Sequence, residues 1–87
     1  MWTVSFLAPA KRKLGRLGPD AHQRILRYLH NRLEGCDDPR LYGKPLSGEP
    51  SGRWRYRAGD YRIICRIDDD RQMVVVLTVG HRRDVYR

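Results

Sequence analysis

Alternating arginine and apolar residues in the segment 53–67, RWRYRAGDYRIICRI, constrain the fold more than any other part of the chain. Successive side chains of a β-strand point to opposite faces of a sheet, so the first three arginines share one face while Trp54 and Tyr56 share the other. The residues AGD at 58–60 supply a hairpin turn, and the alternation then resumes. The segment therefore predicts two antiparallel strands whose arginines gather on one face: Arg53, Arg55, Arg57, Arg62 and Arg66.

Such an array of like charges is costly unless an anion relieves the repulsion, and guanidinium groups match phosphate oxygens through paired hydrogen bonds. The chain contains 18 Lys and Arg against 10 Asp and Glu, which gives 87 residues a formal net charge of +8. This surplus favours nucleic acid, an acidic membrane or an acidic protein as the partner. A run of charge is usually a solvated face, but the alternation and the charge balance together favour binding of a polyanion.

The remaining elements can be placed around this hairpin, and 87 residues suffice for one small domain spanning 1–87. Positions 22, 25, 26, 29 and 33, all apolar except His22, lie on one stripe of a helix from about Pro19 to Glu34, capped by Gly35. The other expected elements are a strand at 2–7, a helix at 10–17, a surface loop at 36–52 and a buried strand at 73–79. Together these elements predict an α+β fold of order β-α-α-β-β-β. The link between the two helices is short, so we expect a helical hairpin packed on one face of a small, mostly antiparallel sheet.

Compartment and cofactors are constrained by features that the sequence lacks. The first residues show no basic region followed by a long apolar run, and no apolar stretch is long enough to span a membrane. These observations predict a cytoplasmic protein with no membrane partner. Cys36 and Cys65 are expected to be two separate reduced thiols. His, Cys and carboxylate residues are not clustered at ligand spacing, so we expect neither a metal nor another cofactor.

Cutting RNA requires proton transfer as well as phosphate binding, and arginine cannot act as a base because its pKa stays above about 12. Arginines can instead offset the charge that develops on a phosphate during in-line attack. The tail offers His81 and Tyr86 as bases, and nearby cations favour the phenolate, so Tyr86 is preferred and His81 is the second choice. Tyr86 could equally close the edge of the core. The expected reaction is attack by a 2′-hydroxyl on the adjacent phosphorus, and the stabilising role fits Arg53, Arg55, Arg62 and Arg82.

Several other residues have plain structural interpretations that compete with functional ones. Trp54 and Tyr61 could stack on bases, but strand parity favours a place in the core. His22 lies on the apolar stripe of a helix and is interpreted as structural. Surface charge or contacts to RNA, including ribosomal RNA, are expected for Arg57, Arg66, Arg83, Lys44, Lys11 and Lys13.

Two segments, GKPLSGEPSGRWRYRAGDYRII and VVVLTVGHRRDVY, resemble the RelE toxins of the RelE/ParE superfamily. The resemblance covers most of the chain and includes the order of its elements. It implies a type II toxin that enters the 30S A site of the ribosome, cleaves mRNA there and is held inactive by an acidic, RelB-like antitoxin. It also places the family's phosphate-binding positions on Arg53, Arg55, Arg62 and Arg82, and its functional C-terminal tyrosine on Tyr86.

This sequence departs from the best-studied RelE pattern at Arg53 and Arg55, where lysines are usual, so proton donation from those positions is not expected here. Two alternative functions remain open. ParE-like relatives share the fold but inhibit DNA gyrase without cleaving RNA. A non-catalytic RNA-binding or ribosome-binding module would keep the arginines but would be indifferent to Tyr86.

Overall fold

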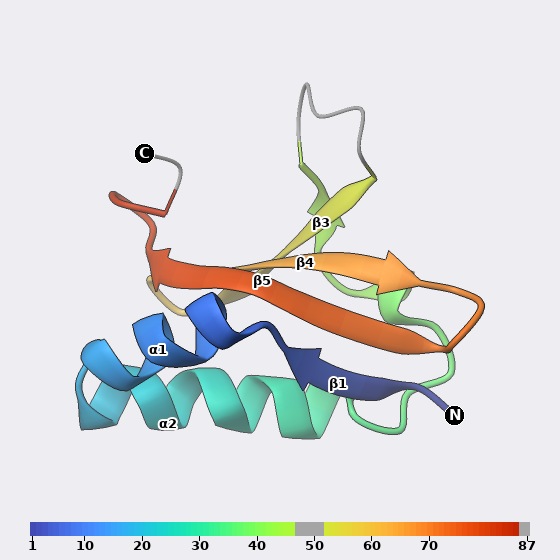
Figure 1. Ribbon diagram of the computed structural model, residues 1–87, viewed down its shortest axis with the longest axis horizontal. Helices are drawn as coiled ribbons and strands as arrows, with labels where there is room; N and C mark the ends of the chain where they lie inside the picture. Colours follow the sequence, from blue (N-terminus) through green and yellow to red (C-terminus); the bar gives the residue numbers. More distant parts are fainter. Residues whose placement is uncertain (47–51, 86–87) are drawn as a thin grey trace.

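The computed structural model describes residues 1–46 and 52–85, which form two helices packed on a five-stranded mixed sheet (Figure 1). This arrangement confirms the expected α+β fold, with one short strand, β2, added to the predicted order. The elements are β1 (Thr3–Phe6), α1 (Ala8–Arg16), α2 (Pro19–Tyr28), the π-helical turn η1 (Leu29–Leu33), the 3-10 turn η2 (Pro39–Leu41), β2 (Lys44–Pro45), β3 (Arg53–Ala58), β4 (Tyr61–Asp68) and β5 (Met73–His81).

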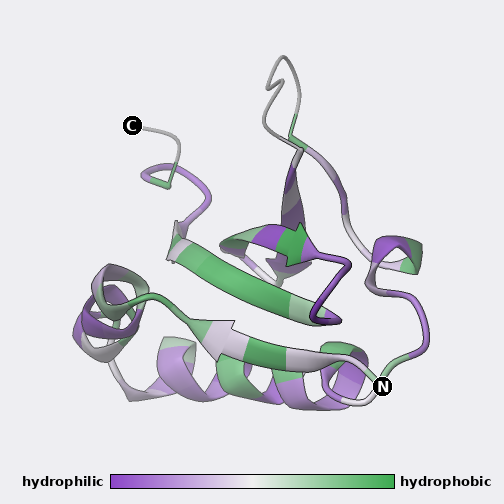
Figure 2. Ribbon diagram, turned by 45° about the vertical axis from the view of Figure 1, so that its right-hand side comes forward, coloured by the Kyte–Doolittle hydropathy of each residue, from purple (hydrophilic) through white to green (hydrophobic). Residues whose placement is uncertain are grey.

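The strands are ordered β1-β5-β4-β3-β2, and only the β1–β5 pairing is parallel. Both helices lie on the same side of this sheet, so neither α1 nor α2 covers its other face (Figure 1). The main core forms between the sheet and the helices and includes Tyr56, Ile63 and Val76, each with no exposed surface. Figure 2 shows that β5 is hydrophobic along almost its whole length, as expected for a strand with neighbours on both sides. No helix within the described residues is long and apolar enough to cross a membrane.

Strand β5 contains a bulge that the sequence did not predict. Ile64 pairs with Thr78 and Cys65 pairs with Val76, so Leu77 is an extra residue on β5. The bulge reverses the alternation of the side chains that follow it. As a result Val76 and Val79, three residues apart, are both fully buried on the helix side. The strand also runs two residues beyond the expected end at Val79 and reaches His81.

The second helix changes its winding near its end, where the sequence predicted a continuous helix to Glu34. The α-helix stops at Tyr28 and η1 follows, with the Glu34 N–H donating to the Leu29 carbonyl oxygen at 2.9 Å. This wider turn keeps Leu29 and Leu33 in the core, where they continue the buried series that starts at Ala21 and Ile25. The buried stripe is therefore centred differently from the expected one, and Leu26 is 39% exposed.

The expected surface loop at 36–52 contains the turn η2 and the strand β2, which the sequence analysis missed. The buried Tyr56 hydroxyl donates a hydrogen bond to the Pro39 carbonyl oxygen at 2.9 Å and ties η2 to β3. Gly43 has φ of 69° and lies so close to β3 that a Cβ atom there would overlap the Arg55 carbonyl oxygen. This close approach lets Lys44 and Pro45 pair with Arg55 and Trp54. Residues 47–51 lie outside the described part of the chain.

Replacing Gly15 with alanine is expected to stabilise the protein. Gly15 is an exposed residue inside α1, and no atom of the described residues outside the helix's own backbone and the two chain neighbours lies within 4 Å of where its Cβ would stand. Alanine should stabilise the helix by about 1 kcal/mol, because glycine loses more backbone entropy on folding. The melting temperature followed by circular dichroism should then rise by roughly 4–8 °C.

Gly18→Ala provides the control with the opposite sign. A Cβ at Gly18 also meets no atom of the described part of the chain within 4 Å, but Gly18 has φ of 91°, which an alanine adopts only with strain. An equal rise in melting temperature for both variants would contradict this account of Gly15.

Candidate active site

The five arginines of the β3–β4 hairpin lie on the sheet face opposite the helices, as their alternation predicts. In the antiparallel ladder of β3 and β4, Arg57 lies directly opposite Arg62, and Arg53 lies directly opposite Arg66. Arg55 lies between them, next to Lys44 of β2 on the other side. Trp54 and Tyr61 point the other way and pack against the core, which confirms their structural interpretation. We call the side of the sheet that carries Arg53, Arg55, Arg57, Arg62 and Arg66 the arginine face.

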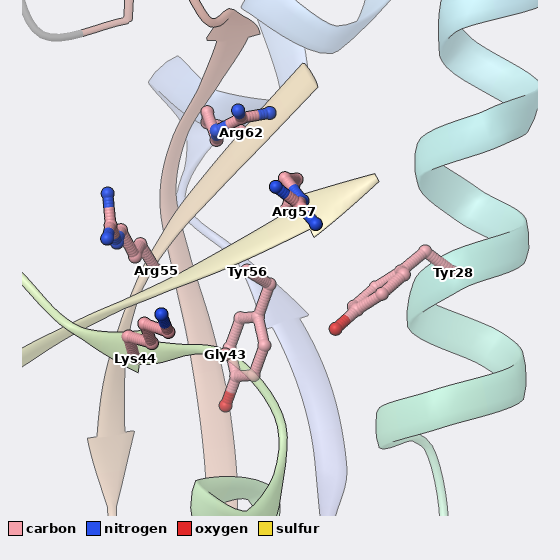
Figure 3. Close-up of a pocket in the computed structure, with 7 residues that line it drawn as sticks. All are labelled: Tyr28, Gly43, Lys44, Arg55, Tyr56, Arg57 and Arg62. Atoms are coloured by element: carbon pink, nitrogen blue, oxygen red, sulfur yellow. The ribbon is translucent and has the colours of Figure 1, made fainter. Parts of the chain in front are cut away.

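A hollow of about 320 Å³ opens where the arginine face meets the free edge of β3, and we call it the active-site hollow (Figure 3). It exists because β2 pairs only with the first half of β3, so beyond Arg55 that edge has no neighbouring strand within the described residues. Cations from three strands point into it, and Tyr28 approaches from α2. The lining residues are Tyr28, Gly43, Lys44, Arg55, Tyr56, Arg57 and Arg62.

The side chain of Arg62 is fixed by the turn that precedes it. Its Nη1 donates hydrogen bonds to the carbonyl oxygens of Gly59 at 3.0 Å and Tyr61 at 3.1 Å. A guanidinium has five N–H donors, so most of its hydrogen-bonding capacity is left for a ligand. Arg62 is half-buried, as is Arg55, whereas Arg57 is exposed. The hollow therefore contains one guanidinium that is oriented in advance, that of Arg62, and other cations whose side chains have more conformational freedom.

The cations of the hollow are not neutralised by carboxylates of the described residues. The described residues form four salt bridges, and all of them lie outside the hollow: Arg40–Asp69, Arg66–Asp68, Arg71–Asp68 and Arg82–Asp60. No described carboxylate lines the hollow. Removing these guanidiniums from bulk water without a counter-charge is unfavourable, and a bound anion would relieve that cost. The site is thus suited to a phosphate.

The two tyrosines of the hollow remain neutral phenols at neutral pH. Burial raises the pKa of Tyr28 above its ordinary value, although the Arg32 guanidinium acts in the opposite direction. Burial also raises the pKa of Tyr56, whose hydroxyl donates to the Pro39 carbonyl. The described lining residues therefore offer cations to an anion but include no carboxylate or imidazole to accept a proton.

The segment after β5 returns over the arginine face. Gly80 pairs with Arg62, and the buried Val85 packs on Gly80 so closely that a Cβ there would lie 3.3 Å from the Val85 Cβ. The Arg82 N–H donates to the Asp60 carbonyl oxygen at 2.8 Å, and the Arg82 Nε lies 3.9 Å from Asp60 Oδ1. Arg82 is thereby held beside the turn that anchors Arg62, but it does not line the hollow. Tyr86, the expected base, lies outside the described residues.

His81, the second candidate base, is not brought to the hollow. Its ring contacts Tyr61 edge-on at 5.7 Å, and Tyr61 packs against the core on the helix side. The His81 Nδ1 accepts a hydrogen bond from the Arg83 N–H at 3.2 Å. The imidazole is therefore on the opposite side of the sheet from Arg62.

The residues expected to contact RNA are distributed unevenly. Lys44 and Arg57 line the hollow, whereas Arg53 and Arg66 lie farther along the arginine face. Lys13 reaches β5, where its Nζ donates to Thr78 Oγ1 at 3.4 Å, while Lys11 and Arg83 are exposed.

Tyr28 and Gly43 line the hollow but were missed in the sequence. Tyr28 lies close to Arg24, Arg27 and Arg32 in the sequence, and an aromatic residue among arginines is a signal that could have identified it. No local signal identifies Gly43, because its role depends on the approach of β3.

The thiols of Cys36 and Cys65 are both free, as expected. Within residues 1–46 and 52–85, no group of three or more His, Cys, Asp or Glu side chains is placed to hold a metal ion.

Comparisons with known proteins give a consistent result. A family described as the ParE toxin of the type II toxin–antitoxin system, parDE, matches residues 4–86. Toxin RelG of Mycobacterium tuberculosis is 38% identical over 86 residues, which cover 99% of this chain and 97% of that toxin. The crystal structure of the toxin–antitoxin complex RelBE2 from the same organism has a TM-score of 0.81 at 37% identity, covering 95% of this chain and 93% of that chain. The isolated RelE toxin of E. coli has a TM-score of 0.74 at 23% identity, covering 99% and 92%, and thus shares the fold.

Proposed function

As the chain belongs to the RelE/ParE superfamily of type II toxins, we propose that it is a ribosome-dependent endoribonuclease that cleaves mRNA in the ribosomal A site. The observation that carries this proposal is the active-site hollow, where Lys44, Arg55, Arg57 and Arg62 meet without a described carboxylate. A hollow of this charge fits a phosphate within an RNA strand.

The proposed reaction is an in-line displacement at one phosphate of the message. The 2′-oxygen attacks the adjacent phosphorus, its proton passes to a base, and the bond from phosphorus to the 5′-oxygen breaks as that oxygen gains a proton. The products are a 2′,3′-cyclic phosphate and a 5′-hydroxyl. Arg55 and Arg62 hold the phosphate and offset the charge that develops on its oxygens, with Arg53 and Arg82 at its flanks. Tyr86 serves as base or proton relay.

Tyr86→Phe is expected to slow cleavage about 100-fold, the size of effect typical for loss of a positioned proton acceptor. Binding to ribosomes should remain unchanged, because the variant keeps the ring and every arginine. Single-turnover cleavage at saturating ribosome concentration measures the first quantity, and co-sedimentation with ribosomes measures the second.

Tyr61→Phe is the matched control, since it removes the same atom from a ring on the helix side of the sheet. Its cleavage rate should stay close to that of the parent protein. Equal rates for Tyr86→Phe and the parent protein would remove Tyr86 from the mechanism.

Primer extension of a message on programmed ribosomes tests the activity itself. Stops within the A-site codon are the expected result, and naked RNA should be a poor substrate, because ribosomal positioning supplies the orientation of the 2′-hydroxyl. A DNA supercoiling assay with gyrase is the companion experiment, since the fold alone does not separate RelE-like from ParE-like action. Inhibition of gyrase without any A-site stop would overturn the proposal.

The proposed partner that restrains the activity is an acidic, RelB-like antitoxin. The M. tuberculosis relative of known structure was solved as a toxin–antitoxin complex, and E. coli RelE is also known as an intact RelBE complex. An acidic chain is complementary to a toxin with a net charge of +8.

A further inference from the structure

A second hollow, of about 630 Å³, lies between α2 and the end of β3, and we call it the α2 groove. Its basic residues are Arg24 and Arg27 from α2, Arg32 from η1 and Arg57 from β3. Arg57 and Tyr28 also line the active-site hollow, so the two hollows meet at the free edge of β3 (Figure 3). A ligand that leaves the active-site hollow across this edge enters the α2 groove.

The β3–β4 turn leaves room for the Arg24 side chain because residue 59 is a glycine. Gly59 has φ of 64°, and a Cβ atom there would lie 2.6 Å from the Arg24 Nη1. The Arg24 side chain therefore lies directly against the β3–β4 turn, next to the end of the strand that carries Arg57. Helix and hairpin thus bring their guanidiniums to the same groove.

The charge of the groove is left uncompensated by the described residues. None of its four arginines takes part in a salt bridge there, and Asp20 is the single described carboxylate among the lining residues. The groove is also lined by the neutral polar residues Gln23 and Asn31. These residues add hydrogen-bonding groups without adding negative charge.

Tyr28 gives the groove an aromatic surface between its cations. Its ring centroid lies 6.1 Å from that of Tyr56 at an angle of 49°, and its hydroxyl has no hydrogen-bond partner among the described residues. Basic residues that follow a backbone, interleaved with an aromatic ring on which a base can stack, are the usual composition of a site for single-stranded nucleic acid. An acidic peptide would use the cations but has no comparable use for the ring.

We propose that a single RNA strand continues from the active-site hollow across the free edge of β3 into the α2 groove. Arg57 holds the phosphate at the crossing, Tyr28 stacks on a base, and Arg24 and Arg27 hold the phosphates beyond. The inference rests on the proposed function in identifying that strand as the cleaved message.

Binding of non-cleavable, single-stranded 2′-O-methyl RNA to the full chain tests the path, with fluorescence anisotropy as the readout. Oligomers of about 4 and about 12 nucleotides both fall within the range of site sizes known for small single-strand binders. The variant Arg24→Gln/Arg27→Gln should bind the short RNA as the parent does and the long RNA roughly 20-fold more weakly at 0.1 M salt. The slope of log K against log salt should fall by about 1.4 for the long RNA, the value for two lost phosphate contacts.

The matched control is Arg12→Gln/Arg16→Gln, which removes the same charge from exposed positions of α1 that line neither hollow. This control should keep most of the affinity for the long RNA. Equal weakening by the two double variants would overturn the proposal, since net charge alone would then explain binding. Unchanged RNA binding combined with lost binding of a polyglutamate peptide would overturn it too, and would assign the groove to a protein.

Cleavage on ribosomes is measured separately, so the two proposals fail independently. A parent protein that shows the length-dependent RNA binding but no A-site cleavage would retain the groove and lose the proposed activity. A parent protein that cleaves but gains no affinity from the longer RNA would retain the activity and lose the groove.

Discussion

Replacing Arg62 with alanine is expected to reduce mRNA cleavage on programmed ribosomes about 1000-fold, the upper end of the effect of losing one pre-oriented donor. Arg62 is held by the Gly59 and Tyr61 carbonyl oxygens before any substrate arrives, so its guanidinium need not reorganise during the reaction. Single-turnover cleavage measures the loss. Ribosome binding should change little, because the other cations of the active-site hollow remain.

Arg66→Ala is the matched control, because Arg66 lies on the same strand and the same face but outside the active-site hollow. It should reduce cleavage only a fewfold. Arg62→Lys should behave like the alanine variant, since an ammonium cannot keep both carbonyl contacts and a paired hold on the phosphate. Similar cleavage by the Arg62→Ala and Arg66→Ala variants would disprove the assignment of Arg62.

Gly43→Ala is expected to destabilise the protein by about 3 kcal/mol, through steric overlap added to backbone strain. A Cβ at this position overlaps the Arg55 carbonyl oxygen and lies 2.7 Å from the Tyr56 ring, neither of which can move aside without disturbing β3. The β2–β3 pairing should break and carry Lys44 away from the active-site hollow, so cleavage should fall together with stability. Urea unfolding measures the first effect and single-turnover cleavage the second.

The variant Gly52→Ala is the control that measures backbone strain without steric overlap of a new Cβ atom. Gly52 has φ of 75°, similar to Gly43, but a Cβ there has no neighbour within 4 Å among the described residues. It should cost only about 1 kcal/mol, the backbone component alone. If the two variants lose equal stability, the close approach of Gly43 to β3 has no energetic importance.

The arginine hairpin could be predicted from the sequence because its information is local. Strand alternation placed Arg55 and Arg62 on one face, and the tight turn between Ala58 and Tyr61 fixed their register. The same local pattern correctly placed Trp54 against the core. The helix was predicted over the right residues but not with the right winding, since the π-turn serves the packing of Leu33 against distant strands.

The parts that could not be predicted depend on contacts between distant segments. The two-residue strand β2 has no periodicity of its own and forms because Gly43 allows close approach to Arg55. Arg57 was expected to be surface charge or a contact to RNA, but its place at both hollows could not be predicted, because the helix that completes the second hollow is about thirty residues away in the sequence. The position of His81 followed from the bulge, which the run of valines does not encode by itself.

The extra residue in β5 has an evolutionary consequence. Because directly opposite residues of two paired strands share a face, loss of the single codon for Leu77 would remove the bulge while Gly80 stayed opposite Arg62 and His81 stayed opposite Tyr61. The imidazole would remain on the helix side, and the tail would keep the bare backbone against which Val85 packs. Relatives that differ in length by one residue at this point would therefore present the same groups to the phosphate, with their arginines unchanged.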